Sequence, residues 1–287
     1  MYAHANGVRI YFDVEGAGLV ARGSEMVEKP PCFVVHGGPA YDHSYFKPWL
    51  TPLSEDLQLI YLDHRGTGRS SEAPEESYTL KQIAADIEEL RRHLGFERIS
   101  VLGHSVGGFI ALTYALAYPA SVATLITVAT ASSNRWRDPV EELIARTGNA
   151  RQKEILHRIL AGEEAGESEY REWFHTMAPL LHFRTYDPGA VDEFLDRMRG
   201  NRRTEAAMWR NALAEYDLTT RLSEVTAPTL VIAGEYDGIT SIEVVQQVAA
   251  QIPNATFQVI PECGHWIFVE AQDAFVRLIA EFVKQHT

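Results

Sequence analysis

The sequence predicts an α/β fold with a mostly parallel central sheet. Short, uninterrupted apolar runs recur along the chain, as at residues 32–35, 99–102 and 229–233, and such runs are typical of strands buried on both faces. Stretches with apolar residues at steps of three and four lie between several of these runs. Strands that alternate with helices indicate βαβ crossovers, and therefore a parallel sheet flanked by helices.

The strands are expected in the following order. Residues 8–15 alternate between apolar and polar and predict an edge strand, and the stretch 16–31, rich in glycine, proline and charge, predicts a turn or a long hairpin loop. Buried strands are expected at residues 32–35, 57–62, 99–102, 123–128, 229–233 and 257–260.

Three helices have clear signals in the sequence. Thr79 and Gln82 form a T-x-x-Q capping box ahead of an apolar pattern with helical spacing, which Gly95 ends. Residues 106–117 predict a helix that leaves the strand at 99–102. Apolar residues at steps of three and four predict a last helix over residues 268–282.

The alternation of strands and helices breaks between residues 134 and 216. This segment has a helical pattern without strand-like runs, and it is rich in aromatic residues. We interpret it as a helical cap, or lid, inserted into an α/β core. The prediction divides the chain into a core, residues 1–133 and 217–287, and a cap, residues 134–216.

Charge and composition exclude several classes of protein. The chain has 287 residues, of which 46% are hydrophobic and 23% are charged, and these values are ordinary for a globular protein. Its 26 basic and 39 acidic residues give a net charge of −13, which would repel nucleic acid. No apolar run approaches the roughly 18 residues of a membrane helix. Two cysteines make no disulfide framework and no secretory signal is recognisable, so we expect a cytoplasmic location without membrane insertion.

The strongest chemical signal is a G-x-S-x-G motif at residues 103–107. A predicted strand runs into it and a predicted helix leaves it, which is the context of a nucleophile elbow. Ser105 would sit on a strained turn at the carboxyl edge of the sheet. Gly103 and Gly107 are expected because side chains at these positions would collide with their neighbours. The sequence therefore predicts Ser105 as a nucleophile.

A serine nucleophile needs a base and an acid that orients the base. His265 follows the last predicted strand, and Asp237 follows the strand at 229–233, so the chain order is Ser, Asp, His. Glu235 is the rival acid, and we favour Asp237 because it lies further out on its loop. The backbone N–H groups of Gly38 and Val106 are the expected oxyanion hole. His36 is expected to brace its loop.

From about residue 6 to the C-terminus the chain resembles the α/β-hydrolase superfamily. Within it, HGGPA at residues 36–40 and DHRGTGRS at residues 63–70 resemble the proline iminopeptidase branch. The resemblance implies a Ser105–Asp237–His265 triad, cleavage of N-terminal proline from short peptides, and cap carboxylates that hold the free amine. The segment 63–70 is expected to be structural, with an ion pair of Arg65 and Asp63 between adjacent loops.

These observations predict a serine hydrolase that needs no cofactor or metal and acts on a small molecule or a short peptide. Proline iminopeptidase-like aminopeptidase action is the first expectation. Its candidate substrate-binding residues are Glu172, Glu205, Glu215 and Trp209. Two departures from the branch leave an ester or lactone substrate open: Ala40 replaces the last glycine of HGGPG, and the elbow reads GHSVG instead of GGSWG. Perhydrolase chemistry and a non-catalytic, ligand-binding role on the same fold are further alternatives.

Overall fold

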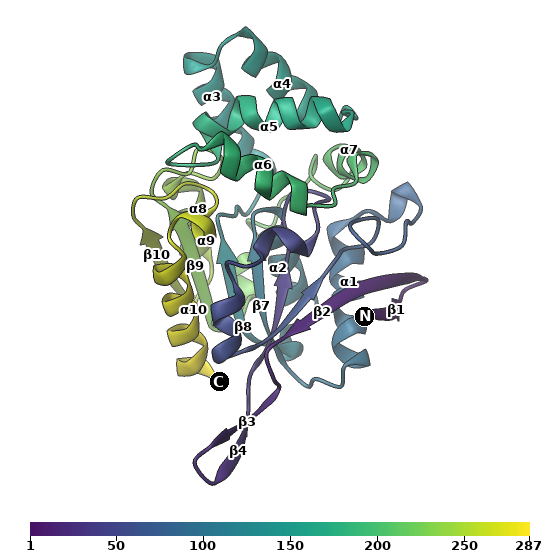
Figure 1. Cartoon of the computed structure of the whole chain (residues 1–287), viewed down its shortest axis with the longest axis vertical. Coiled ribbons are helices and arrows are strands. Elements are labelled where there is room, and N and C mark those ends of the chain that lie inside the picture. The colour runs from purple at the N-terminus through teal and green to yellow at the C-terminus, as the bar shows by residue number, and fades with distance from the viewer.

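The computed structural model describes residues 1–21 and 23–287 in full, and an eight-stranded sheet forms its centre (Figure 1). The sheet consists of β1 (Tyr2–Ala5), β2 (Val8–Glu15), β6 (Gln58–Leu62), β5 (Pro31–Val35), β7 (Ile99–His104), β8 (Val122–Val128), β9 (Thr229–Gly234) and β10 (Ala255–Ile260), in this spatial order. The pairs β1–β2 and β2–β6 are antiparallel, and all the others are parallel. The predicted α/β fold with a mostly parallel sheet is confirmed.

Helices flank this sheet. They are α1 (Leu80–His93), α2 (Val106–Ala117), α8 (Ile242–Gln251), α9 (Ile267–Glu270) and α10 (Gln272–His286). The Thr79 hydroxyl accepts a hydrogen bond from the Gln82 N–H at 3.1 Å, so the first half of the predicted capping box forms. The second half does not, because the Thr79 N–H donates to the Ser77 carbonyl at 2.9 Å. All six residues of β7 are buried, as its apolar sequence predicts for a strand covered on both faces. Single 3₁₀ turns lie at η1 (His43–Phe46), η2 (Thr51–Glu55), η3 (Glu75–Ser77), η4 (Pro119–Ser121), η5 (Asn134–Trp136) and η6 (Leu222–Glu224).

Five helices lie between β8 and β9 in the sequence. They are α3 (Arg137–Thr147), α4 (Ala150–Leu160), α5 (Glu167–Leu181), α6 (Pro188–Arg197) and α7 (Arg202–Arg210). Figure 1 shows them gathered over one end of the strands. We call residues 134–216 the helical insertion. That this insertion is a separate cap domain stays a prediction.

The structure corrects two local predictions, on the edge strand and on the last helix, and it confirms the hairpin alternative for a third. Residues 8–15 form β2, which is not an edge strand, because β1 pairs with it through a two-residue turn and takes the edge. The stretch 16–31 contains a two-stranded hairpin, β3 (Leu19–Arg22) with β4 (Glu25–Glu28), which projects away from the helical insertion (Figure 1). The last predicted helix is two helices, because Ala271 leaves the helical conformation at φ −136° and ψ 43°.

None of the helices among the described residues combines the length and the apolar character needed to cross a lipid bilayer.

Candidate active site

The candidate nucleophile lies on a sharp turn between β7 and α2. Ser105 has φ 55° and ψ −122°, an unusual conformation for a residue other than glycine. The turn is held by three hydrogen bonds: the Ser105 N–H donates to the Val128 carbonyl at 2.9 Å, and the Ser105 carbonyl accepts from the Gly108 N–H at 2.8 Å and from the Thr130 hydroxyl at 2.9 Å. Strained backbone of this kind persists only where surrounding contacts enforce it.

Glycines surround Ser105 because the turn packs backbone directly against backbone. A Cβ atom on Gly103 would lie 2.2 Å from the Gly107 carbonyl oxygen, and one on Gly107 would lie 2.1 Å from the Val35 carbonyl oxygen. One on Gly108 would lie 2.3 Å from Oγ1 of Thr130. The spacing of the motif therefore reflects contacts that no larger residue could make.

The candidate base and acid are directly bonded. His265 Nδ1 and Asp237 Oδ2 are 2.8 Å apart. Asp237 also accepts from the Ile239 and Thr240 N–H groups and from the Thr240 hydroxyl, at 2.7–2.9 Å. Because the carboxylate occupies Nδ1, the second ring nitrogen of His265 is free to exchange a proton with a reacting group.

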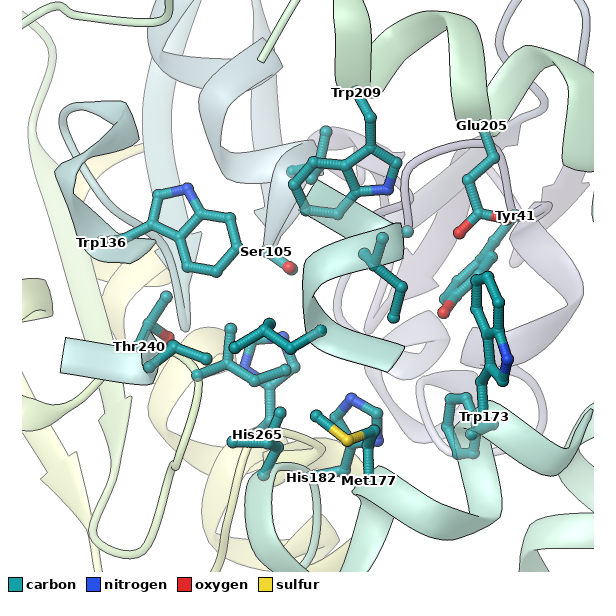
Figure 2. Close-up of a pocket in the computed structure, with 18 of the residues that line it drawn as sticks. Tyr41, Ser105, Trp136, Trp173, Met177, His182, Glu205, Trp209, Thr240 and His265 are labelled. Atoms are coloured by element: carbon teal, nitrogen blue, oxygen red, sulfur yellow. The ribbon is translucent and has the colours of Figure 1, made fainter. Parts of the chain in front are cut away.

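Ser105 and His265 line the same cavity, as do Gly38 and Val106, the residues predicted to supply the oxyanion hole (Figure 2). Gly38 has φ +124°, which only glycine adopts readily. Among the described residues, neither the Gly38 nor the Val106 N–H donates a hydrogen bond. Two unoccupied donors therefore border the cavity that Ser105 faces.

The cavity has a volume of about 120 Å³ and mostly apolar walls. Its aromatic lining includes Tyr41, Phe109, Trp136, Tyr170, Trp173, Phe174, Trp209 and Trp266, and its aliphatic lining includes Val140, Leu156, Ile159, Leu160 and Met177. Most of these side chains come from the helical insertion. A cavity of this size and character fits a small, largely apolar group attached to the reacting carbonyl.

One acidic side chain, Glu205 on α7, belongs to the described lining of the cavity. Arg202 Nη1 donates to Glu205 Oε2 at 2.5 Å, and the Glu205 side chain is 16% exposed. Arg202 in turn lies 3.5 Å from the ring centroid of Tyr170. Burial raises the pKa of Glu205 to about 7 although the neighbouring Arg202 opposes this shift.

The other predicted substrate-binding residues divide into two groups. Trp209 lines the cavity one turn beyond Glu205, and Figure 2 shows its indole nitrogen turned toward that carboxylate. Glu172 does not reach the cavity, because it forms an ion pair with Arg151 at 2.8 Å on the outer surface. Glu215 is exposed, outside the lining. The structure therefore brings Glu205 and Trp209 to Ser105 and leaves Glu172 and Glu215 away from it.

The loop at residues 63–70 differs from its prediction. Arg65 does not pair with Asp63. It donates twice to Asp86 on α1, at 2.6 and 2.7 Å, and both side chains are buried. Asp63 instead accepts from His43 Nδ1 at 2.6 Å and from the Arg69 N–H at 2.8 Å. These contacts are consistent with the structural role expected for the segment, which stays a prediction.

Sequence reasoning missed three side chains at or beside the site, Tyr41, His182 and Arg202. Tyr41 lines the cavity and accepts a hydrogen bond from the Tyr170 hydroxyl at 2.5 Å. His182 also lines it, with its ring centroid 6.4 Å from that of His265, and burial lowers the pKa of His182 to about 3. Neither Tyr41 nor His182 belongs to a recognisable motif. Helical spacing is the available signal for Arg202, which lies one turn before Glu205.

The chain is similar to known proteins over most of its length. A proline iminopeptidase of Lactobacillus helveticus (strain DPC 4571) is 29% identical over 277 residues, covering 91% of this chain and 92% of the relative. The solved proline iminopeptidase of Mycobacterium smegmatis superposes with a TM-score of 0.79 at 23% identity, over 100% of this chain and 98% of the other.

Solved structures of proteins described with other activities also superpose on this chain. Est816, described as an N-acyl homoserine lactone degrading enzyme, superposes with a TM-score of 0.74 at 23% identity, over 98% of this chain and 100% of the other. At such identities a structural match shows the fold alone. Residues 30–272 match the family model of the alpha/beta hydrolase fold. The chain belongs to the α/β-hydrolase fold family.

Proposed function

We propose that this protein is a serine hydrolase that removes an N-terminal residue, proline first, from a short peptide through an acyl-enzyme. The carboxylate of Glu205 carries the proposal, because it shares the cavity with Ser105 and His265. Arg202 engages Oε2, and among the described residues Oε1 has no hydrogen-bond partner. A free carboxylate oxygen is the group that would accept a hydrogen bond from a substrate ammonium.

The proposed reaction has two steps. Ser105 Oγ attacks the carbonyl carbon while His265 Nε2 takes the hydroxyl proton, and the Gly38 and Val106 N–H groups stabilise the oxyanion. His265 then returns the proton to the leaving amine as the C–N bond breaks. A water molecule, deprotonated by the same nitrogen, attacks the ester and releases the acid and Ser105.

The indole N–H of Trp209 adds to the polar end of the cavity. This nitrogen is buried and has no partner among the described residues. An unpaired buried donor has a free-energy cost of about 1–3 kcal/mol, which a substrate oxygen could relieve. Glu205 and Trp209 together would accept from an amine and donate to a nearby oxygen.

The apolar walls favour a second candidate, hydrolysis of a carboxylic ester or lactone. Indole, phenyl and aliphatic groups make up most of the lining, and the single carboxylate is already paired with Arg202. An acyl chain without an amine would therefore bury its surface in this cavity without leaving an unpaired charge.

A substrate panel separates the two candidates. Purified protein is assayed with proline p-nitroanilide and with p-nitrophenyl esters, each also with Glu205→Gln and with Glu172→Gln as the control on the outer surface. The peptidase proposal predicts anilide turnover that Glu205→Gln reduces and Glu172→Gln does not. Ester turnover without anilide turnover would replace it by the second candidate.

A further inference from the structure

A chain of three hydrogen bonds connects the loop at Gly37 to the loop that carries His265. The Gly37 N–H donates to the Tyr45 hydroxyl oxygen at 2.8 Å. The Tyr45 hydroxyl and His104 Nδ1 are 3.1 Å apart, and His104 Nε2 and the His265 carbonyl oxygen are 2.9 Å apart. The three elements lie far apart in sequence, on η1, at the end of β7 and after β10.

The direction of every bond in this chain can be assigned. The His265 carbonyl can only accept, so His104 Nε2 carries the proton. Burial lowers the pKa of His104 well below its usual value, so the ring is neutral and its Nδ1 is an acceptor. Tyr45 therefore donates to His104 Nδ1 and accepts from Gly37. Each donor and each acceptor in the chain then has one partner.

Gly37 is held from its other side as well. His36 Nδ1 lies 3.0 Å from the Gly37 carbonyl oxygen, which belongs to the same peptide unit as the Gly38 N–H. Because a peptide unit is planar, fixing that carbonyl also fixes the direction of the Gly38 N–H. Tyr45 thus anchors the residue next to the expected oxyanion donor.

We propose that Tyr45 and His104 are a positioning pair, which holds the oxyanion loop at a fixed distance from the imidazole of His265. The inference rests on the proposed function, because the two side chains would position the oxyanion donors and the base that the proposed reaction uses. His104 borders the cavity, with its ring centroid 4.8 Å from that of His265, but neither side chain acts on the substrate in this account. Catalysis depends on such placement, since misplacement of a reacting group by about 1 Å can lower a rate about 100-fold.

The aromatic surroundings of Tyr45 make a clean test possible. Its ring stacks on Phe46 with centroids 4.2 Å apart and packs edge-on against Trp266 at 5.1 Å. Tyr45→Phe keeps this ring and removes only the hydroxyl. Tyr114→Phe is the matched control: Tyr114 is also fully buried, and its hydroxyl donates to Glu88 at 2.9 Å, between α1 and α2.

The experiment uses the full chain and the substrate that the panel shows the wild type to turn over. Active sites are titrated with a fluorophosphonate, and kcat and KM are measured per labelled site. Tyr45→Phe is expected to lower kcat at least about tenfold, the effect of one buried hydrogen bond, with KM within about twofold. Affinity for a boronic acid that forms a tetrahedral adduct should fall by the same factor, while affinity for the product acid stays unchanged. Tyr114→Phe should leave all four quantities unchanged.

Substitutions of His104 test the second half of the chain. His104→Leu removes both hydrogen bonds and should lower kcat at least as much as Tyr45→Phe. His104→Gln places an amide N–H near the position of Nε2, so it should recover part of that loss. The double variant of Tyr45→Phe and His104→Leu should lose less kcat than the two single losses multiplied together, because both changes interrupt one chain.

The outcomes separate this inference from the proposed function. A wild type that neither turns over any substrate in the panel nor reacts with the fluorophosphonate contradicts the proposed function. An active wild type whose Tyr45→Phe variant keeps its kcat overturns the positioning pair alone. Equal losses of affinity for the boronic acid and the product acid would also overturn it, because they would show general damage to the pocket.

Discussion

His265 Nδ1 and Asp237 Oδ2 lie 2.8 Å apart, and neither side chain is more than 4% exposed. The two residues are far enough apart in sequence to belong to different loops, one after β9 and one after β10. Because these strands are parallel neighbours, their carboxyl ends deliver both loops to the same edge of the sheet. The pair therefore follows from the topology of the sheet.

Asp237→Asn tests whether this contact orients the base. An amide in place of the carboxylate favours the wrong tautomer of His265, so kcat should fall by roughly 10³- to 10⁴-fold, with little change in KM. Glu235→Gln is the control, because Glu235 is exposed and accepts from the Glu262 N–H at 3.0 Å. Comparable losses in both variants, measured as kcat, would count against Asp237 as the orienting acid.

Glu205 predicts a pH dependence of substrate binding. Burial raises its pKa to about 7, so the carboxyl group is ionised above that pH and protonated below it. An ammonium substrate needs the ionised form. The KM of proline p-nitroanilide should therefore rise as the pH falls below about 7, while the KM of a neutral ester should not.

The variant Glu205→Gln supplies the control for this titration. Glutamine does not ionise, so the rise in KM on the acidic side should disappear. At pH 8 the KM for the anilide should be about 10- to 100-fold higher than that of the wild type, the effect of losing a hydrogen bond to a charged group. If the acidic rise persists in Glu205→Gln, another group is responsible for it.

The buried ion pair of Arg65 and Asp86, which is remote from the reacting atoms, is expected to stabilise the fold. Their side chains are 2% and 3% exposed, and Asp86→Ala would leave a buried guanidinium without its partner. The free energy of unfolding should fall by about 3–5 kcal/mol, measured by urea denaturation. Glu224→Ala, which breaks the exposed pair of Glu224 with Arg221, should leave the urea midpoint unchanged. An unchanged midpoint for Asp86→Ala would refute the prediction.

Much of this fold was predictable from local patterns. Parallel strands buried on both faces must be apolar throughout, so β5 and β7 are visible in the sequence as short apolar runs. The elbow was predictable because its glycines are required by contacts with the backbone around Ser105. Chain order then indicated Asp237 and His265, and the structure shows these two side chains in contact.

The edge of the sheet was harder to predict. β1 has only four residues, and two of its residues are buried in an alternating pattern too short to stand out. The available signal was its turn: Asn6 and Gly7 both have positive φ, at 46° and 83°, as a two-residue hairpin of Asn-Gly type requires. Reading that dipeptide as a hairpin would have moved the edge from residues 8–15 to residues 2–5.

Side chains in the helical insertion could not be chosen from the sequence alone. Glu172, Glu205 and Glu215 all lie in the helical insertion, and only the packing of α7 over the cavity selects Glu205. The partner of Arg65 could not be predicted either, because Asp86 lies on a helix whose position depends on the whole core. Contacts between elements distant in sequence decide which glutamate lines the cavity and which residue pairs with Arg65.

The central claim is that Ser105 is an activated nucleophile. Intact-mass spectrometry after incubation with a fluorophosphonate tests it most directly, with Ser105→Ala as the control and proteolytic mapping of the labelled peptide. We predict a single adduct on Ser105 of the wild type, no adduct on Ser105→Ala, and the same melting temperature for both. An unlabelled wild type, or equal labelling of both proteins, would contradict the account.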